Sequence, residues 1–464
     1  MASSPHIPEF ILEIAEEIRS RDGILYIVGG WVRDYLLGHD SHDYDLEVYG
    51  IEADALESLL RKYGKPSRVG RSFGIIILAR DGVQYDFALP RTESKTGKGH
   101  KGFLVNPDPT LTFETASSRR DFTMNAMGMK LPEFELVDYH GGKSDLENRV
   151  LRHVSDAFSE DPLRALRAVQ FAARFGLEID PATQKLCSRQ PLDELSPERI
   201  FGEFTKLLMK SRRPSIGLEW MRNMDLLRFF PELGALVGVK QDPEWHPEGD
   251  VWTHTLMVVD EAAVLRSELA DEKEQMSFMF GALCHDFGKP ATTQFVEGRW
   301  KSPKHDVEGR KLVERFMSRM TNESALIEDV VKYCEFHLRP IQFYNARDEV
   351  SDGAIRRLAL KIDIRKLVLL AKADQLGRTT PEALERVFPA GDWLLKRSEE
   401  LQVLDSRPEP LLGGKDLISL GMRPGPAMGE VLREAFDLQL EGKLSSREDA
   451  LAWAKERESN ALHE

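Results

Sequence analysis

The chain has 464 residues, of which 41% are hydrophobic and 30% charged, and this composition excludes an intrinsically disordered protein. At ordinary domain sizes this length corresponds to about three or four domains. The net charge of −14 excludes a uniformly basic nucleic-acid binder, although one basic face on a folded enzyme remains compatible with it. Three isolated cysteines, Cys187, Cys284 and Cys334, indicate a reducing compartment without disulfides.

No apolar run approaches the length of a membrane span, and the N-terminal segment MASSPHIPEFILEIAEEIRS lacks the basic and long apolar parts of a signal peptide. We therefore expect a cytoplasmic protein with no membrane partner. Two local basic stretches, RTESKTGKGHKGF at 91–103 and KLLMKSRR at 206–213, are candidate RNA contacts. A solvated loop and a solvated helix surface explain them equally well.

Residues 24–136 alternate short β-rich runs with helical runs, which predicts a small mixed sheet with helices packed on it. Strands are predicted at GILYIV, YDLEVY, FGIIILA and VQYDFAL. Helices are predicted at WVRDYLLG and IEADALESLLRKYG, ending at Gly38 and Gly64. The segment 93–107 is rich in Gly, Lys and Thr without a hydrophobic period, and is predicted to be a mobile loop.

The stretch IVGGWVRDYLLGHDSHDYDLEVYG carries the densest group of candidate catalytic residues. Asp43 and Asp45 lie two apart on a predicted strand, so both side chains point to one face and can hold metal ions for phosphoryl transfer. Gly29 and Gly30 end an apolar run and let backbone N–H groups approach a phosphate. Arg33, one helical turn on, can meet a triphosphate. Each signal alone is weak, because GG and DxD also occur in plain turns.

In combination, the order strand, GG, helix, glycine and DxD strand resembles the signature of the polymerase-β-like nucleotidyltransferases. The version with GGxVRD before DxD resembles the class II tRNA nucleotidyltransferase and bacterial poly(A) polymerase family. This resemblance implies that Asp43 and Asp45 are catalytic ligands of Mg²⁺. It also implies that Asp86, in VQYDFAL, completes the metal cluster. An exposed acid on the sheet surface is the alternative for Asp86.

The segment RRDFTMNAM, at 119–127, resembles the second motif of the same family. The resemblance implies that Arg120 contacts the nucleotide or its phosphates. It further implies that Asp121 and Asn125 order the sugar side of the pocket. Asp121 also suits the N-cap of a helix, and both roles are compatible.

A helix is predicted for DPLRALRAVQFAARFG, with Asp161 as N-cap and an end at Gly176. Its start, EDPLR, resembles the EDxxR motif in which an acid and an arginine read the incoming base. Asp161, Arg164 and Arg167 lie along one helix face. A carboxylate and a guanidinium pair with cytosine or adenine, whereas guanine and uracil leave unpaired polar groups at about 1–3 kcal/mol each. The family usually carries a third arginine where this chain has Gln170.

Two loops bear on the branch of the family. VGRSFGII, at 69–76, lacks the doubled basic pair typical of the poly(A) polymerases, since Ser72 follows Arg71. PRTESKTGKGHKGF resembles the flexible loop of enzymes that add the terminal A. Both features favour full CCA addition, or A addition only.

Beyond residue 240 the chain contains a spaced set of His and Asp residues in HPEGDVWTHT, ALCHDFGKP, SPKHDVEG, CEFHLRP and KADQLGR. A His-Asp pair inside an apolar helix is costly to bury without partners. The set resembles the HD phosphohydrolase superfamily, and imidazole with carboxylate suits Ni, Mn, Mg or Zn. By this resemblance the core metal ligands are His254, His285, Asp286 and Asp374. Two further residues would hold a second metal or the substrate: His305 and His337.

The predicted fold class is α+β, with a polymerase-β-like mixed sheet palm followed by an all-helical neck, HD body and tail. The stretch DPEWHPEGD, 242–250, is interpreted as a linker, and RPEPLLGG, 407–414, as a further break. Four domains are predicted: a nucleotidyltransferase head at 1–139, a helical neck at 140–240, an HD domain at 241–390 and a helical tail at 391–464.

Taken together, the resemblances imply template-independent addition of CCA to tRNA 3′ ends from CTP and ATP. They imply a second, HD-domain activity as a 2′,3′-cyclic phosphodiesterase or phosphatase with a transition metal such as Ni²⁺ or Mn²⁺. The helical regions are expected to hold the tRNA acceptor arm through phosphate and shape contacts. Two alternatives stay open. One is an A-adding specialist or poly(A) polymerase, and the other is an HD phosphohydrolase whose head only binds RNA or nucleotide.

Overall fold

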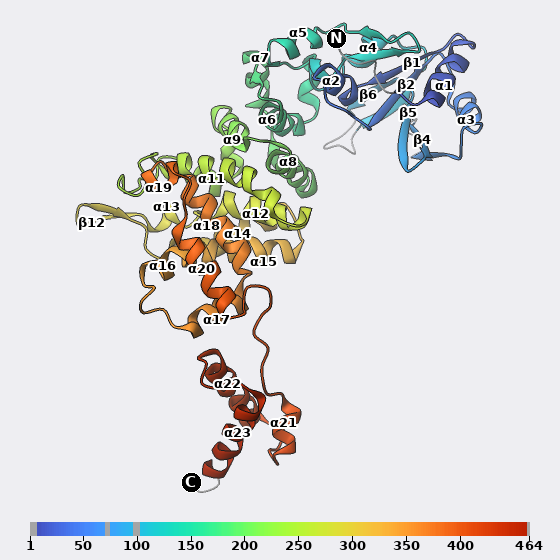
Figure 1. The fold of residues 1–464 in the computed structure, drawn as a ribbon. Coiled ribbons are helices and arrows are strands. Elements are labelled where there is room, and N and C mark those ends of the chain that lie inside the picture. The colour runs from blue at the N-terminus through green and yellow to red at the C-terminus, as the bar shows by residue number, and fades with distance from the viewer. Residues whose placement is uncertain (1–6, 70–74, 96–102, 462–464) are drawn as a thin grey trace. The chain divides into compact units, whose positions relative to one another are not determined.

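The computed structural model describes residues 7–69, 75–95 and 103–461 (Figure 1). The chain divides into two compact units. The first, called here the N-terminal unit, comprises Met1–Leu207 and Ile216–Phe229. The second, called the C-terminal unit, comprises Leu208–Ser215 and Phe230–Glu464. The finer division into four domains stays a prediction.

A seven-stranded sheet, in the order β3-β4-β5-β2-β1-β8-β9, forms the centre of the described part of the N-terminal unit. Strands β2 (Tyr44–Tyr49) and β5 (Val83–Ala88) pair in parallel, and the other neighbours in the sheet are antiparallel. The mixed sheet with a helical remainder confirms the predicted fold class. The remaining strands of the sheet are β1 (Ile24–Val28), β3 (Pro66–Val69), β4 (Ile75–Arg80), β8 (Gly128–Leu131) and β9 (Glu135–Val137).

Short helices connect the strands that carry the GG and DxD motifs. Helix α2 (Gly30–Leu36) begins directly after β1, and Gly38 with φ 74° follows its end, as predicted. Helix α3 (Ala53–Leu60) ends before the predicted Gly64, because residues 61–63 form turns. Helix α1 (Glu9–Arg19) buries one apolar side with Ile11, Ile14 and Ile18.

The prediction of a mobile loop over 93–107 is wrong at both ends. Strand β6 (Arg91–Lys95) pairs antiparallel with β7 (Phe103–Pro107). The run FLVNP begins with aromatic, apolar and β-branched residues, and this local strand preference, together with the ladder, outweighs the Gly-rich composition between the strands. Residues 96–102 lie outside the described residues, as do residues 70–74, on which the argument about the family branch depends.

Helix α6 (Leu163–Phe175) is the predicted nucleotide-selecting helix. It begins two residues after Asp161, whose Oδ1 accepts the N–H of Leu163 at 3.1 Å, and it ends at Gly176 in the left-handed conformation with φ 64°. On its buried side Phe171 packs edge-on against Phe122, with ring centroids 5.7 Å apart. This part of the chain also contains α4 (Phe113–Ser117), α5 (Gly142–Glu147), α7 (Pro181–Cys187), α8 (Pro197–Lys210) and α9 (Pro214–Asn223). Two short strands, β10 (Val150–Leu151) and β11 (Glu178–Ile179), pair in parallel.

The C-terminal unit is helical apart from one hairpin, β12 (Gln294–Val296) with β13 (Arg299–Lys301), within the residues that the structure describes. Trp252, Phe280 and Phe316 are fully buried in its core. The helices that carry the HD residues or pack beside them are α11 (Val251–Leu265), α12 (Glu272–Cys284), α14 (His305–Ser318), α15 (Ser324–Phe336) and α18 (Ile364–Leu376). The others are α10 (Pro231–Gly234), α13 (Lys289–Thr292), α16 (Arg339–Asn345), α17 (Asp352–Lys361), α19 (Pro381–Leu384), α20 (Pro389–Glu400), α21 (Gly414–Ser419), α22 (Pro426–Leu440) and α23 (Arg447–Ala461).

The interpretation of 242–250 as a linker is wrong, because this segment folds within the C-terminal unit. Asp250 caps α11 by accepting the N–H of Thr253 at 2.9 Å. Asp242 binds Arg299 of the hairpin at 2.8 Å. The polar composition that suggests a linker therefore belongs to a structured loop.

Two expectations about the whole chain can be compared with the described residues. All three cysteines are buried and free, as their spacing predicts. No helix in the described ranges combines the length and the apolar character needed to cross a bilayer.

Candidate functional sites

The predicted carboxylate cluster lies at the start of β2. Asp45 is opposite Asp86 in the register of the parallel β2–β5 pair, so the two side chains stand on the same face of neighbouring strands. Asp43 precedes the first residue of β2 rather than lying within it. Partial desolvation, followed by the negative charge of Asp43, raises the pKa of Asp45 to about 6. Three acids therefore lie close enough to interact, which is the arrangement that a divalent cation neutralises.

Gly29 brings the backbone to this cluster. It has φ 71° and ψ −126°, a conformation that residues with a Cβ avoid. A Cβ at this position would lie 3.0 Å from Nη1 of Arg120 and 3.9 Å from Oδ2 of Asp45. Gly30 follows as the first residue of α2. Without a Cβ, Gly29 therefore allows Arg120 to lie close beside Asp45, and the approach of a phosphate to the glycine backbone stays a prediction.

Glu47 is a residue of this site that the sequence reasoning missed. It continues the alternation of Asp43 and Asp45 along the same strand face, and this DxDxE pattern is the signal that was available. Its buried Oε1 accepts from Nη2 of Arg120 at 2.9 Å, and its Oε2 accepts from the hydroxyl of Tyr49 at 2.8 Å. Burial raises the pKa of Glu47, but the charge of Arg120 outweighs this and lowers it overall. Glu47 therefore fixes Arg120 beside the acids.

The residues of the second motif form a buried polar chain. Nη1 of Arg33 donates to Oδ1 of Asn125 at 2.7 Å, and Nδ2 of Asn125 donates to Asp121 at 3.1 Å. Nε of Arg167 in turn donates to Asp121 at 2.7 Å. The Arg33 guanidinium also lies 4.6 Å above the ring of Phe175. In this structure these side chains hold one another, and their contacts with a nucleotide stay predictions.

The EDPLR residues are also anchored within the protein. Arg164 donates to the backbone carbonyls of Ala157 at 2.9 Å and Arg119 at 2.8 Å. Oδ2 of Asp161 binds Arg199 of α8 at 2.7 Å. Arg199 is a second residue that sequence reasoning missed, because nothing in SPERIF marks its partner 38 residues away. The Arg164 guanidinium and the Asp161 carboxylate are therefore held in place by contacts within the protein.

Gln170, at the place of the family's third arginine, is a core residue. It is 1% exposed, and its Oε1 has no hydrogen-bond partner among the described residues. A neutral side chain is the form that this buried position tolerates more easily than a charge.

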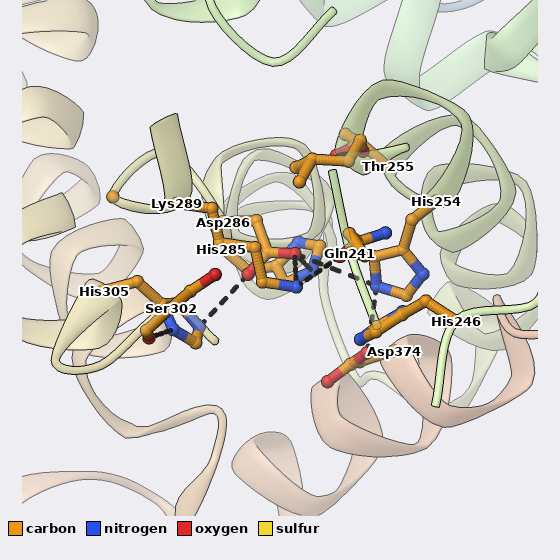
Figure 2. A network of polar contacts seen from close by, with 12 residues as sticks. Gln241, His246, His254, Thr255, His285, Asp286, Lys289, Ser302, His305 and Asp374 are labelled. Carbon is orange, nitrogen blue, oxygen red and sulfur yellow. Dashed lines mark hydrogen bonds and ion pairs between the residues drawn. The ribbon is translucent and has the colours of Figure 1, made fainter. Parts of the chain in front are cut away.

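The HD residues converge in one buried centre of the C-terminal unit (Figure 2). Three histidines are tied in the same way, each by Nδ1 to the carbonyl three residues earlier. His285 donates to Ala282 at 2.8 Å, His305 to Ser302 at 2.8 Å and His337 to Cys334 at 2.7 Å. Since a carbonyl only accepts, each Nδ1 carries a proton, and Nε2 is the ring nitrogen that can bind a metal.

Both carboxylate oxygens of Asp286 lie near Nε2 atoms of these histidines and of His254. Oδ1 lies 3.2 Å from Nε2 of His305 and 3.8 Å from that of His337. Oδ2 lies 3.2 Å from Nε2 of His285 and 3.9 Å from that of His254. Neither oxygen has a well-aligned hydrogen-bond partner in the described part of the chain. Asp286 therefore sits between two pairs of imidazoles, as a carboxylate that bridges two cations would.

Two further observations indicate that these imidazole and carboxylate groups can bind divalent metals. Nε2 of His305 and Nε2 of His337 lie 3.3 Å apart, close enough for both to bind one cation. Nε2 of the buried His285 likewise lacks a partner among the described residues. Two of the ligand groups that the geometry defines are His254 with His285 and Asp374, and Asp286 with His305 and His337.

Lys289 and Arg378 supply positive charge at this centre. Nζ of Lys289 lies 2.7 Å from Asp286 and donates to Gln241 at 2.7 Å. Nη2 of Arg378 donates to Asp374 at 3.0 Å. Burial alone raises the pKa of both aspartates, but neighbouring positive and imidazole groups hold each well below its usual range. Both carboxylates are thus ionised at neutral pH, as metal ligands would be.

Glu248 and His246 are further residues of the centre that the motif search did not assign. Oε1 of Glu248 accepts from Nδ1 of His246 at 2.8 Å and lies 2.8 Å from Nδ1 of His254. Nε2 of His254 meets Asp374 at 3.1 Å. Burial lowers the pKa of His254, but its contacts with Asp374 and Glu248 raise it overall. Glu248, the acid between His246 and Asp250 in HPEGD, was the available signal, but this segment was interpreted as a linker.

Close backbone packing positions the HD pair against α14. A Cβ on Gly288 would overlap the carbonyl oxygen of His305, so only glycine allows this approach.

Burial lowers the pKa of His337 to about 3, which keeps it neutral and able to bind a metal at pH 7.

Three protein families match consecutive parts of the chain. The Poly A polymerase head domain matches residues 25–152, and the probable RNA and SrmB-binding site of polymerase A matches residues 176–236. The HD domain matches residues 251–379. Nucleotidyltransferase and HD domains both imply dependence on divalent metals.

Among solved structures, the fold is similar to that of the Bacillus stearothermophilus CCA-adding enzyme in complex with CTP, with TM-score 0.67, 20% identity and coverage of 99% of this chain and 100% of that chain. The Thermotoga maritima CCA-adding enzyme complexed with tRNA gives TM-score 0.61 and 20% identity, covering 98% and 96% of the two chains.

Curated relatives are more similar in sequence. The chain is 36% identical to the multifunctional CCA protein of Methylococcus capsulatus over 426 residues, which covers 88% of this chain and 92% of the relative. It is 34% identical to that of Xylella fastidiosa over 426 residues, covering 88% and 95%. With this identity along nearly the whole of both chains, the protein belongs to the family of multifunctional CCA proteins.

Proposed function

We propose that the N-terminal unit adds C, C and A to the 3′ end of tRNA from CTP and ATP without a nucleic-acid template. The C-terminal unit hydrolyses phosphate monoesters and 2′,3′-cyclic phosphates at the HD centre. The names of the relatives, and similar structures of CCA-adding enzymes with CTP, ATP and tRNA, support this proposal. The observation that carries it is the register of Asp45 with Asp86, next to Gly29, where Arg120 approaches the backbone closely.

In this proposal the three acids Asp43, Asp45 and Asp86 hold Mg²⁺. Bound Mg²⁺ lowers the pKa of the attacking 3′-hydroxyl and offsets the charge of the departing pyrophosphate. Asp86, next to Asp45 in register, is placed to accept the hydroxyl proton. Arg120, held by Glu47 at 2.9 Å, directs its remaining N–H donors toward the triphosphate.

Selection of the base falls to Asp161 and Arg164. A guanidinium has five donors, and two of those of Arg164 are used on backbone carbonyls, which orients the others toward a ring nitrogen. Asp161, positioned by Arg199, accepts from the exocyclic amine of cytosine or adenine. One hydrogen-bonded chain links Arg33, Asn125, Asp121 and Arg167. In this proposal Arg33 meets the triphosphate, while Asp121 and Asn125 order the sugar side of the pocket. The match of residues 176–236 to an RNA-binding region supports tRNA acceptor-arm contacts there.

In the C-terminal unit we assign two metal positions that share Asp286. One is held by His254, His285 and Asp374, and the other by His305 and His337. Imidazole-rich sets favour a transition ion such as Ni²⁺ or Mn²⁺, which lowers the pKa of a water and polarises the phosphate. Lys289 adds a buried cation 2.7 Å from Asp286, suited to the charge of a phosphate.

Incorporation of single nucleotides on staged tRNA ends tests the first activity. Three substrates end before CCA, after the first C and after the second C, and each receives CTP, ATP, GTP or UTP. The proposal expects two additions from CTP, then one from ATP, and none from GTP or UTP. Addition of A only to the substrate ending in CC indicates an A-adding specialist, and a long tail indicates a poly(A) polymerase. Hydrolysis of 2′,3′-cyclic AMP without any incorporation indicates a head that only binds.

A further inference from the structure

The four candidate metal-binding histidines of the HD centre differ in what holds their second ring nitrogen. His285, His305 and His337 each donate Nδ1–H to a neutral backbone carbonyl. Nδ1 of His254 instead lies 2.8 Å from Oε1 of Glu248, an ion-pair contact that is not aligned as a hydrogen bond, and it has no hydrogen-bond partner among the described residues. In the described part of the chain, the His254 side of the centre is therefore the one with a carboxylate behind a candidate ligand.

Glu248 is also tied to three different segments. It lies in the loop 242–250, accepts from His246 at 2.8 Å and contacts His254 of α11. Its Oε2 accepts the backbone N–H of Thr379 at 3.4 Å, just after the helix that carries Asp374. Its side chain is 1% exposed. The carboxylate thus sits where the three segments meet, with little freedom to turn elsewhere.

When a metal takes Nε2 of His254, the ring proton must stay on Nδ1, and Glu248 is the acceptor within reach. A carboxylate behind a histidine fixes the tautomer and raises the basicity of the ligand more than a neutral carbonyl does. We propose that Glu248 is a positioning residue that makes the metal position of His254, His285 and Asp374 the tighter of the two in the HD centre. This inference rests on the metal centre of the proposed function.

The test is a Mn²⁺ titration of the metal-free full chain, followed by the electron paramagnetic resonance signal of free Mn²⁺. The wild type is expected to bind in a tight and a weaker step. Glu248→Gln removes the charge, keeps the size, and is expected to weaken the tight step about 10–100-fold while the weaker step remains. The matched control Glu244→Gln changes an exposed acid of the same loop, 64% exposed, and is expected to bind like the wild type.

Three results would overturn the inference. Unchanged tight binding in Glu248→Gln removes the role of the carboxylate. Loss of both steps, or a changed circular dichroism spectrum, shows that Glu248 holds the fold rather than one ligand. Equal weakening in Glu244→Gln shows an effect of overall charge. A wild type that binds no Mn²⁺ contradicts the metal centre itself, and so separates failure of the proposed function from failure of this inference.

Discussion

The two candidate metal sites are built in opposite ways. At the acids of the N-terminal unit, Asp43 and Asp45 keep exposed side chains, and the neighbouring carboxylates repel one another. In the HD centre every ligand is buried, and three histidines are oriented by backbone carbonyls. An open cluster of acids suits Mg²⁺ that arrives with a nucleotide, whereas a closed imidazole cage suits a resident transition metal. The comparison teaches that one chain can combine an exposed site built from acids with a buried site rich in imidazole.

The largest expected effect comes from removing one key acid of each site. Asp45→Ala is expected to lower CTP incorporation about 10³-fold or more, since it removes several kcal/mol of transition-state stabilisation, while hydrolysis of 2′,3′-cyclic AMP persists. Asp286→Ala is expected to do the reverse. Initial rates of both reactions measured on both variants check this. Loss of both activities in either variant would contradict two independent centres.

Replacing Gly29 is expected to have the next largest effect. In Gly29→Ala a Cβ would lie 3.0 Å from Nη1 of Arg120, at a backbone φ of 71°. Strain of about 1–3 kcal/mol and a displaced Arg120 should lower incorporation about 10–100-fold. Gly38→Ala is the matched control, because Gly38 has φ 74° but nothing within 4 Å of the added Cβ. Equal loss of incorporation in both variants would show that strain alone, not closeness to the acids, is responsible.

Removing the charge of Glu47 should have a moderate effect. Glu47→Gln weakens the pairing with Arg120, so we expect a fall in the free energy of unfolding of about 1–3 kcal/mol and weaker use of CTP. Denaturant unfolding and the kcat and KM for CTP measure these two effects. Glu52→Gln, an exposed acid without a capping hydrogen bond, should change neither. If Glu47→Gln lost only stability, its proposed role in placing Arg120 would be wrong.

The smallest expected effect is on metal-free stability as pH changes. The pKa of Asp45 is raised to about 6 in the folded chain, above the ordinary value of 3.8. Its favourable contribution is therefore fully present below pH 3.8 and is lost as pH rises through about 6. Asp45→Asn should accordingly gain stability relative to the wild type as pH rises from 3.8 to about 6, and keep that gain at higher pH, by thermal unfolding in chelator. A stability difference that does not change with pH would contradict this. No comparable gain is expected for the HD aspartates, whose pKa is lowered.

Elements with a clear hydrophobic pattern or a known motif are predicted better from the sequence than the segments that connect them. Local patterns predict strands β1, β2, β4 and β5 and the glycine stop at Gly38 after α2. Motif order predicts the convergence of the HD residues. The hairpin of β6 and β7 was missed because its pairing depends on contacts across the segment between them, not on local composition. Asp43 was placed inside the strand, whereas β2 begins one residue later.

Supporting residues of the sites were the hardest to predict. Glu47 and Arg199 act through partners far away in the chain, 73 and 38 residues distant. Glu248 lies only 6 residues before its partner His254, but the polar loop around it resembles a linker in composition. Such residues become visible only when tertiary structure brings an acid against a buried nitrogen donor.

Anomalous diffraction from crystals of the full chain with Mn²⁺, collected with and without CTP, tests the central claim most directly. The account predicts Mn²⁺ beside Asp286 in both crystals. It predicts Mn²⁺ within about 2.2 Å of a carboxylate oxygen of Asp45 only when CTP is bound. Density for CTP in the N-terminal unit with no Mn²⁺ peak at Asp43 or Asp45 would contradict the account.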